Sequence, residues 1–326
     1  MEISRIFYRT YPAICDIDND GDLDLFLGVE SGKLAYYRNE GTKKEADFEL
    51  IDGAYFSTGN IWFRPKFFDI DNDGDYDLFD AYNNIRYYEN TGTAEAPVWA
   101  AENPDYLQGN FNTPYLDLAI ADADGDGDAD MAVVVQGKCM FYRNEGTPEA
   151  AGFVFERNNY VIYSQVYFGC IDFGDLNGDG RPDMLVGSNE PHILFNDTLE
   201  TGLRWHKVPL DIPGLYRKYP ALGDLDHDGD LDLLYLNTPT GIIAYVENTG
   251  SADTAIWAAP VTNYITTGLT DLNSMRLLDI DADGDLDLLF GTDNGKIACL
   301  INKGTAGQPA WSAAIETTWG GIDRGV

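Results

Sequence analysis

The chain has 326 residues, a net charge of −34 at pH 7 and 44% hydrophobic residues. This acidic balance argues against nucleic acid or an anionic membrane as the partner, because both are negatively charged. No apolar run approaches the roughly 20 residues that insertion across a bilayer requires, and the opening MEISRIFYRT lacks the apolar core of a signal peptide. Four cysteines are too few for a disulfide scaffold, so we expect thiols without disulfide bonds.

Taken in order, the chain repeats one unit six times, at intervals of 49 to 55 residues. The first unit predicts a strand at 12–17, an acidic loop at 16–24 and a second strand at 23–28. An aromatic-rich strand follows and ends in the segment Asn-x-Gly-Thr at 39–42. A fourth strand is predicted in several units, as at 97–100, 255–259 and 309–314. Four short strands per unit are typical of a propeller blade, and no segment has a helical apolar period.

The Asn-x-Gly segment recurs in five of the six units. The fourth unit departs from it, with the sequence LFNDTLETG at 194–202. Asparagine and glycine favour the left-handed region of backbone conformation, so we expect tight turns with positive φ at these segments.

The acidic loop is the most regular part of the unit. Its copies are DIDNDGDLD, DIDNDGDYD, DADGDGDAD, DLNGDGRPD, DLDHDGDLD and DIDADGDLD, at 16–24, 69–77, 122–130, 175–183, 224–232 and 279–287. Short oxygen-bearing side chains occupy positions 1, 3, 5 and 9, and glycine always occupies position 6. Such spacing lets the oxygens converge on one hard cation while glycine takes the sharp turn. The loops therefore predict six Ca²⁺ sites.

The residues found at position 7 indicate whether its side chain or its backbone carbonyl binds the cation. Position 7 is aspartate in five copies but Arg181 in the fourth, and a guanidinium cannot ligate a cation, so we expect the backbone carbonyl to serve. Mg²⁺ fits less well, because it rarely occupies an all-protein cage. An EF-hand is excluded, since position 12 is never the glutamate that motif needs.

The predicted calcium ligands are therefore the residues at five positions of each loop. Position 1 is Asp16, Asp69, Asp122, Asp175, Asp224 and Asp279. Position 3 is Asp18, Asp71, Asp124, Asn177, Asp226 and Asp281. Position 5 is Asp20, Asp73, Asp126, Asp179, Asp228 and Asp283. Position 7 is Asp22, Asp75, Asp128, Arg181, Asp230 and Asp285. Position 9 is Asp24, Asp77, Asp130, Asp183, Asp232 and Asp287.

The acidic loop, the apolar strand after it and the Asn-x-Gly-Thr segment together resemble the FG-GAP/VCBS repeat family. FGDLNGDGRPDMLVG at 173–187 matches the pattern best. The resemblance covers essentially the whole chain and implies an all-β β-propeller, similar to the integrin-α propeller, with a calcium loop in each blade. The six repeats predict a six-bladed β-propeller of four-stranded blades, and the alternative is a fragment of a seven- or eight-bladed ring. We expect residues 1–326 to form one such domain, closed between its first and last units. The resemblance does not imply a particular ligand.

Binding residues are expected on the face opposite the acidic loops. Strands alternate in direction, so the acidic loops and the Asn-x-Gly segments share one face, and the more variable connections lie on the other. Aromatic and arginine side chains there could stack on sugar rings or hold a peptide. The candidates are Trp62, Arg64, Tyr115, Tyr167, Tyr216 and Arg217. The alternative is that these side chains pack between blades.

The sequence favours a non-catalytic, calcium-stabilised binding or adhesion module that acts outside the cell or at its surface, on a glycan or an extracellular protein. No G-x-S-x-G, H-E-x-x-H or P-loop motif is present, and we assign no catalytic residue. Two alternatives stay open. One is a carbohydrate-active enzyme, a polysaccharide lyase or hydrolase, or its scaffold, and the other is a structural component of an extracellular assembly. The sequence does not indicate an oligomeric state.

Overall fold

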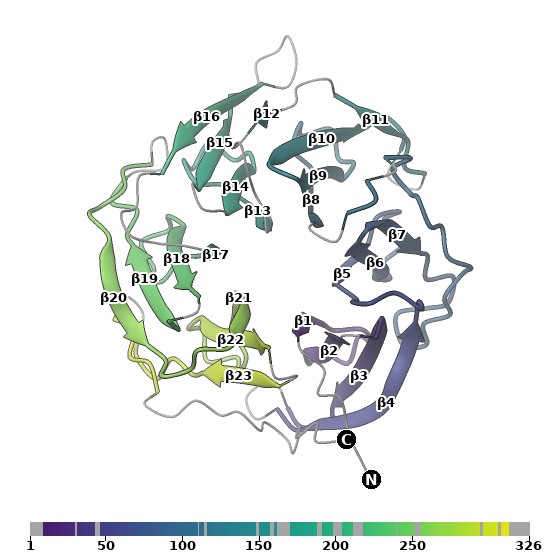
Figure 1. Cartoon of the computed structure of the whole chain (residues 1–326), viewed down its shortest axis with the longest axis horizontal. Coiled ribbons are helices and arrows are strands. Elements are labelled where there is room, and N and C mark those ends of the chain that lie inside the picture. Colours follow the sequence, from purple (N-terminus) through teal and green to yellow (C-terminus); the bar gives the residue numbers. More distant parts are fainter. Residues whose placement is uncertain are drawn as a thin grey trace.

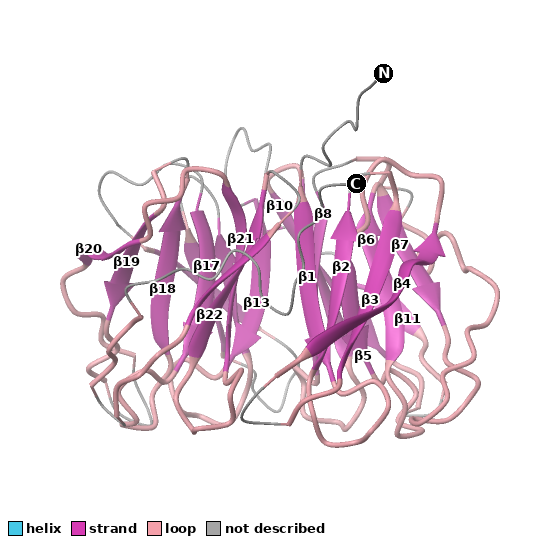
Figure 2. Ribbon diagram, turned by 90° about the horizontal axis from the view of Figure 1, so that it is seen from below, coloured by secondary structure: helices cyan, strands magenta, loops and turns pink. Residues whose placement is uncertain are grey.

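The fold is a ring of six antiparallel β-sheets, seen in a computed structural model (Figure 1). The structure describes residues 9–29, 31–42, 46–109, 111–113, 116–147, 150–156, 160–161, 170–187, 191–197, 204–210, 218–238, 240–250, 255–293, 296–305 and 308–312. The strands stand between two rims of loops (Figure 2). The predicted six-bladed all-β propeller is confirmed. Within the described residues we find no helical segment with the length and apolar character that a membrane span requires.

Each blade is built from consecutive strands, with its first strand innermost in the ring. Blade 1 contains β1 (Thr10–Cys15), β2 (Asp24–Val29), β3 (Lys33–Asn39) and β4 (Phe48–Ser57), and blade 2 contains β5 (Pro65–Phe68), β6 (Asp77–Tyr82) and β7 (Asn84–Tyr88). Blade 3 contains β8 (Leu116–Ala121), β9 (Asp130–Val135), β10 (Lys138–Asn144), β11 (Phe153–Phe155) and β12 (Tyr160–Val161). Blade 4 contains β13 (Cys170–Gly174), β14 (Asp183–Gly187), β15 (His192–Asn196) and β16 (Trp205–Pro209). Blade 5 contains β17 (Lys218–Gly223), β18 (Asp232–Asn237), β19 (Ile242–Val246) and β20 (Val261–Thr266), and blade 6 contains β21 (Leu272–Leu278), β22 (Asp287–Thr292) and β23 (Ile297–Leu300).

The expectation of four strands in every blade is wrong for blades 2 and 6, which have three each among the described residues. The expected fourth strand is reduced to isolated bridges, Asn90 with Trp99 in blade 2 and Asn302 with Trp311 in blade 6. Pro97 and Pro309 begin these two segments and carry no N–H, so a continuous ladder cannot extend through them.

The Asn-x-Gly segments also differ from expectation. Gly92, Gly146 and Gly304 do not have positive φ. Instead, a Cβ on any of them would lie 2.1 to 2.3 Å from a backbone carbonyl oxygen of the following segment. Glycine is therefore required for close approach of two backbone segments and not for a left-handed turn.

The hydrophobic core consists of six clusters, and each cluster joins two neighbouring blades. The second strand of each blade serves two clusters at once. In β2, Phe26 packs toward blade 2, where its ring centroid is 4.4 Å from that of Phe67, whereas Leu25 and Leu27 pack with Leu289 of blade 6. Because both faces of the strand are buried, its sequence is continuously apolar and does not alternate with polar residues.

Blades 1 and 6 close the ring. The hydroxyl of Thr10 in β1 donates to the carbonyl of Lys296 at 2.7 Å and accepts from the N–H of Thr292 at 3.0 Å. Arg9 Nε lies 3.2 Å from Asp293 Oδ1 at the same seam. Among the described residues, the strands of blade 1 precede all others and those of blade 6 follow all others, so the two blades meet without sharing a strand.

Substitution of Gly291 tests how tightly the seam is packed. A Cβ there would lie 2.1 Å from the carbonyl oxygen of Thr10 across the seam. We expect Gly291→Ala to lower the free energy of unfolding by about 1–3 kcal/mol, the usual range for overpacking. The control is Gly152→Ala, because a Cβ there has no neighbour closer than 3.4 Å. Denaturant unfolding measures both, and equal stability of the two variants would contradict the close packing at the seam.

Candidate functional site

The six acidic loops share one hydrogen-bonding pattern. In every loop the N–H of the glycine at position 6 donates to the position 1 carboxylate, over 2.8 to 3.1 Å. The N–H of position 7 donates to the position 5 carboxylate over 2.9 to 3.0 Å. These bonds fold the loop around its own carboxylates and place positions 1, 3 and 5 on its inner side. The fourth loop keeps the pattern, although position 7 is Arg181.

Two positions of each loop have left-handed backbone conformation. The position 6 glycines have φ between +82° and +98°, as predicted. Position 4 is also left-handed, with φ between +51° and +78°, and sequence reasoning missed it. Asparagine, glycine and histidine occupy position 4 in five loops, which was the available signal, whereas Ala282 occupies it in the sixth.

The carboxylates converge closely enough to hold a cation. In the first, second and fifth loops, oxygens of positions 1, 3 and 5 all lie within 4.8 Å of one another. In the third and sixth loops, the same holds for positions 1, 3 and 9. Several of these carboxylates have a buried oxygen that no described residue donates to, namely Oδ1 of Asp16, Asp18, Asp71, Asp224 and Asp281. A buried carboxylate oxygen without a donor is costly, so this arrangement fits a bound cation.

The neighbouring carboxylates also influence one another at position 3. Burial raises the pKa of Asp18, Asp71 and Asp281, and the adjacent loop carboxylates raise it further. Positive charge inside the loop would offset both effects.

Position 9 has a structural role that sequence reasoning did not find. These aspartates are at most 1% exposed, and each is the first residue of the second strand of its blade. In all six blades, Oδ1 accepts the N–H of the asparagine at or just after the end of the third strand, over 2.7 to 2.9 Å. In five blades, Oδ2 accepts the N–H of loop position 2. Burial raises the pKa of Asp77 and Asp130 to about 7 and that of Asp232 to about 6, against the lowering effect of these hydrogen bonds.

The asparagine that bonds to position 9 also joins neighbouring blades. Asn196 Nδ2 donates to the carbonyl of Ala123 at 2.6 Å, and Asn248 Nδ2 donates to the carbonyl of Leu176 at 3.2 Å. Both acceptors are position 2 of the acidic loop in the preceding blade. The divergent fourth unit keeps this asparagine although it lacks the Asn-x-Gly sequence. One aspartate–asparagine pair per unit therefore connects loop and strands, and in the fourth and fifth units it also connects neighbouring blades.

Of the six residues predicted for the opposite face, the structure describes two. Trp62 is half-buried, with Arg9 over its ring at 5.2 Å and the ring of Tyr82 at 5.5 Å. Arg64 is 9% exposed, and its Nη1 donates to the carbonyl of Leu116 in the next blade at 2.7 Å. The other four, Tyr115, Tyr167, Tyr216 and Arg217, lie outside the described residues. A ligand-binding role for the six stays a prediction.

The four cysteines, all within the described residues, form no disulfide bond. Cys139 and Cys299 are buried in two different interblade clusters. Burial raises the pKa of the Cys139 thiol to about 12. These thiols therefore pack as small apolar side chains.

Reciprocal substitutions test the left-handed conformation at position 4. Gly125 has φ +78° and open space around its Cα, so Gly125→Ala adds backbone strain without a clash. We expect it to lower the free energy of unfolding by about 1 kcal/mol. Ala282→Gly should raise that free energy by a few tenths to about 1 kcal/mol, because relief of strain exceeds the entropy that glycine adds to the unfolded chain. Changes of the same sign in the two variants would refute this interpretation.

Comparison with known proteins agrees with the repeat assignment. A model of the FG-GAP-like repeat matches residues 16–79, 122–186, 175–235 and 224–290. A search of curated protein sequences finds no match to this chain.

Solved propellers resemble the fold at low sequence identity. One is a lectin from Agrocybe aegerita that recognises non-reducing terminal N-acetylglucosamine, with TM-score 0.58, 15% identity, and coverage of 95% of this chain and 80% of that one. Another is AofleA from Arthrobotrys oligospora, with TM-score 0.56, 14% identity, and coverage of 96% and 87%. A third is BBS1N in complex with ARL6DN, with TM-score 0.53, 12% identity, and coverage of 97% and 85%. At these identities the likeness concerns the fold alone. The repeat match, in contrast, spans most of the chain, and the chain therefore belongs to the FG-GAP-like repeat family.

Proposed function

We propose that this chain is a non-catalytic binding module whose six acidic loops each hold a structural Ca²⁺. The observation that carries the proposal is made in the first, second, fifth and sixth loops, where carboxylates converge within 4.8 Å and include buried oxygens that no described residue donates to. Ca²⁺ takes six to eight oxygen ligands, and side chains at positions 1, 3, 5 and 9, the carbonyl of position 7 and water supply that number. The ion would neutralise charges that otherwise repel within nine residues.

Calcium bound in these loops would stabilise the fold and would take no part in catalysis. All of its protein ligands come from one loop, and position 9 continues directly into the second strand, so the ion would fix the connection between the first and second strands of each blade. Because the ion binds the folded chain and not the unfolded one, it stabilises the fold by mass action. Loops of moderate affinity fill only where calcium is abundant, which supports a location outside the cell or at its surface.

The ligand is proposed to be a glycan or an extracellular protein, bound on the face opposite the acidic loops. Among the similar folds, one recognises a terminal N-acetylglucosamine and another is in complex with a protein. Connections on that face differ between blades, whereas the acidic loops repeat one geometry. A rigid scaffold with variable loops is the usual arrangement for recognition.

Two substitutions in one loop test the calcium sites. Metal analysis of the wild-type chain should find six Ca²⁺, with affinities on the order of 10⁻⁵ M, and chelator should lower its melting temperature by many degrees. Asp18→Ala removes a side-chain ligand and should leave five ions. Asp22→Ala, at position 7 of the same loop, keeps the carbonyl and should leave six. An unchanged melting temperature once the ions are removed, or equal loss of calcium in both variants, would refute the assignment.

Among the six sites, that of the fourth loop should release calcium first as chelator is added. Asn177 replaces a carboxylate there, and the Arg181 guanidinium lies 3.6 Å from Asp179 Oδ2. Both features reduce the negative charge available to the ion.

The opposite-face site is tested through Trp62. A glycan array would first identify a bound sugar, and an assay of polysaccharide turnover would detect the alternative, an enzyme or its scaffold. We expect Trp62→Ala to weaken binding by about 1–3 kcal/mol, in the range of interface hot spots, with calcium content unchanged. Tyr76→Ala is the matched control, because Tyr76 is an exposed aromatic residue in an acidic loop on the other face. If Trp62→Ala binds normally, or if it merely unfolds, Trp62 is a packing residue.

A further inference from the structure

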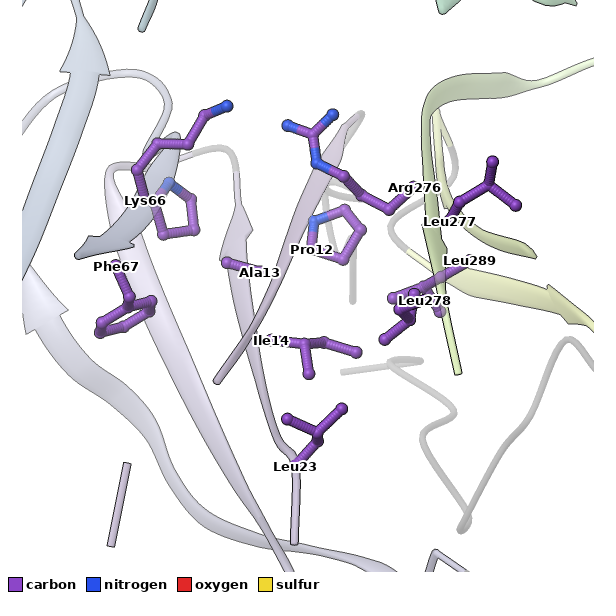
Figure 3. A pocket seen from close by; sticks show the side chains of 11 residues that line it. Pro12, Ala13, Ile14, Leu23, Lys66, Phe67, Arg276, Leu277, Leu278 and Leu289 are labelled. Carbon is purple, nitrogen blue, oxygen red and sulfur yellow. The ribbon is translucent and has the colours of Figure 1, made fainter. Parts of the chain in front are cut away.

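Two adjoining cavities are lined by the innermost strands of the ring. The narrower, of about 50 Å³, is lined by residues from all six blades, including Tyr11, Arg64, Asp117, Cys170, Tyr219 and Asn273. The wider, of about 260 Å³, has mainly apolar walls, including Ile14, Leu23, Phe67, Leu277 and Leu289. The two cavities share Pro12, Pro65, Lys66 and Arg276. The charged ends of Lys66 and Arg276 extend toward the same end of the wider cavity (Figure 3).

Within the part of the chain that the structure describes, Arg276 has no acidic partner. Its Nη1 donates to the carbonyl of its own neighbour, Met275, at 3.2 Å. No carboxylate among the described residues lies within 4.0 Å of its guanidinium. The chain has 55 acidic and 21 basic residues, so an arginine without a carboxylate is unexpected here. The guanidinium is thus available to a ligand in the cavity.

The other charges around the cavities are already engaged. Lys66 Nζ lies 3.5 Å from Asp117 Oδ1, while Asp117 Oδ2 accepts the N–H of Ile171 at 3.2 Å. Arg64 is 9% exposed and donates to the Tyr11 hydroxyl at 3.2 Å, but its buried Nε has no acceptor.

Among the described residues, the cations that line the cavities are Arg64, Lys66 and Arg276, and Asp117 and Asp172 act on Lys66. Asp80 accepts the N–H of Arg64 and pairs with Arg86, so Arg276 is left without a carboxylate beside it. Burial lowers the pKa of Lys66, and Arg276 lowers it further, whereas Asp117 and Asp172 raise it. Lys66 and Arg276 are partly buried, and a cation withdrawn from water is stabilised by an anion that pairs with it.

We propose that the two cavities form a binding site for a small monocarboxylate. Its carboxylate lies between Lys66 and Arg276, and its apolar body fills the wider cavity. The carboxylate pairs with the Arg276 guanidinium, since arginine pairs well with a planar carboxylate. The volume is just below the roughly 300–1,000 Å³ typical of drug-sized ligands, which favours a compact ligand. This site is separate from the opposite-face residues and does not depend on them.

The chain in calcium-containing buffer would be titrated with hexanoate by calorimetry, with acetate and hexanol as analogues. Acetate lacks the apolar body and hexanol lacks the charge, so each should bind at least about tenfold more weakly. Arg276→Gln should weaken hexanoate binding by about tenfold or more, and Arg276→Lys should lose less. The control is Arg38→Gln, because Arg38 is exposed and pairs with Glu40, and it should bind hexanoate normally.

The proposal is overturned if hexanoate does not bind or if Arg276→Gln binds it as the wild type does. It is also overturned if acetate or hexanol binds as tightly as hexanoate, since the site would then recognise only the charge or only the apolar body. Because Arg276 has no carboxylate partner, Arg276→Gln should not lower the melting temperature, and a clear decrease would show that the arginine is structural.

Discussion

The rest of the structure depends on the buried aspartate at position 9 of each acidic loop. Its two oxygens connect three parts of a blade, because one accepts an N–H from the start of the loop in five of the six blades and the other accepts an N–H from the end of the third strand in all six. The residue itself begins the second strand. A neutral side chain of the same shape could not accept hydrogen bonds at both oxygens, since an amide has only one carbonyl oxygen. The aspartate therefore fixes the loop and the sheet as one unit.

The buried carboxylate explains why all six acidic loops have the same length, whereas the segments between them do not. Each loop has nine residues, whereas the segments between loops vary, so that the intervals range from 49 to 55 residues. Hydrogen bonds at both ends of the loop leave no room for an insertion, whereas the outer strands β4, β11 and β20 are largely exposed. Blades 2 and 6 show that the outer strand can vary, since their outer segments form only isolated bridges among the described residues.

The number of blades and the position of each loop could be predicted from sequence, because both follow from a repeated pattern. Features that arise between units could not. The glycine of Asn-x-Gly-Thr is needed because another backbone segment approaches it, as at Gly92, and such contacts leave no local signal. Asparagine and glycine at position 4 indicated its left-handed conformation, but Ala282 at the same position weakened that signal. The cavities at the inner strands were also missed, although a charged residue stands three places before the loop in alternate units, as Lys66, Asp172 and Arg276.

The second strand of every blade contacts a different neighbour through each of its faces. In β2, Phe26 and Leu27 are adjacent in sequence but belong to clusters on opposite sides of the blade, whereas Phe26 and Leu78 are far apart in sequence and share one cluster. Substitutions at adjacent residues should therefore be energetically independent, while residues about one repeat apart should be coupled. Insertion of a single residue into such a strand would exchange its two faces and so disturb both neighbouring interfaces together. In the evolution of such a ring, compensating changes would accordingly pass from blade to blade and not along the strand.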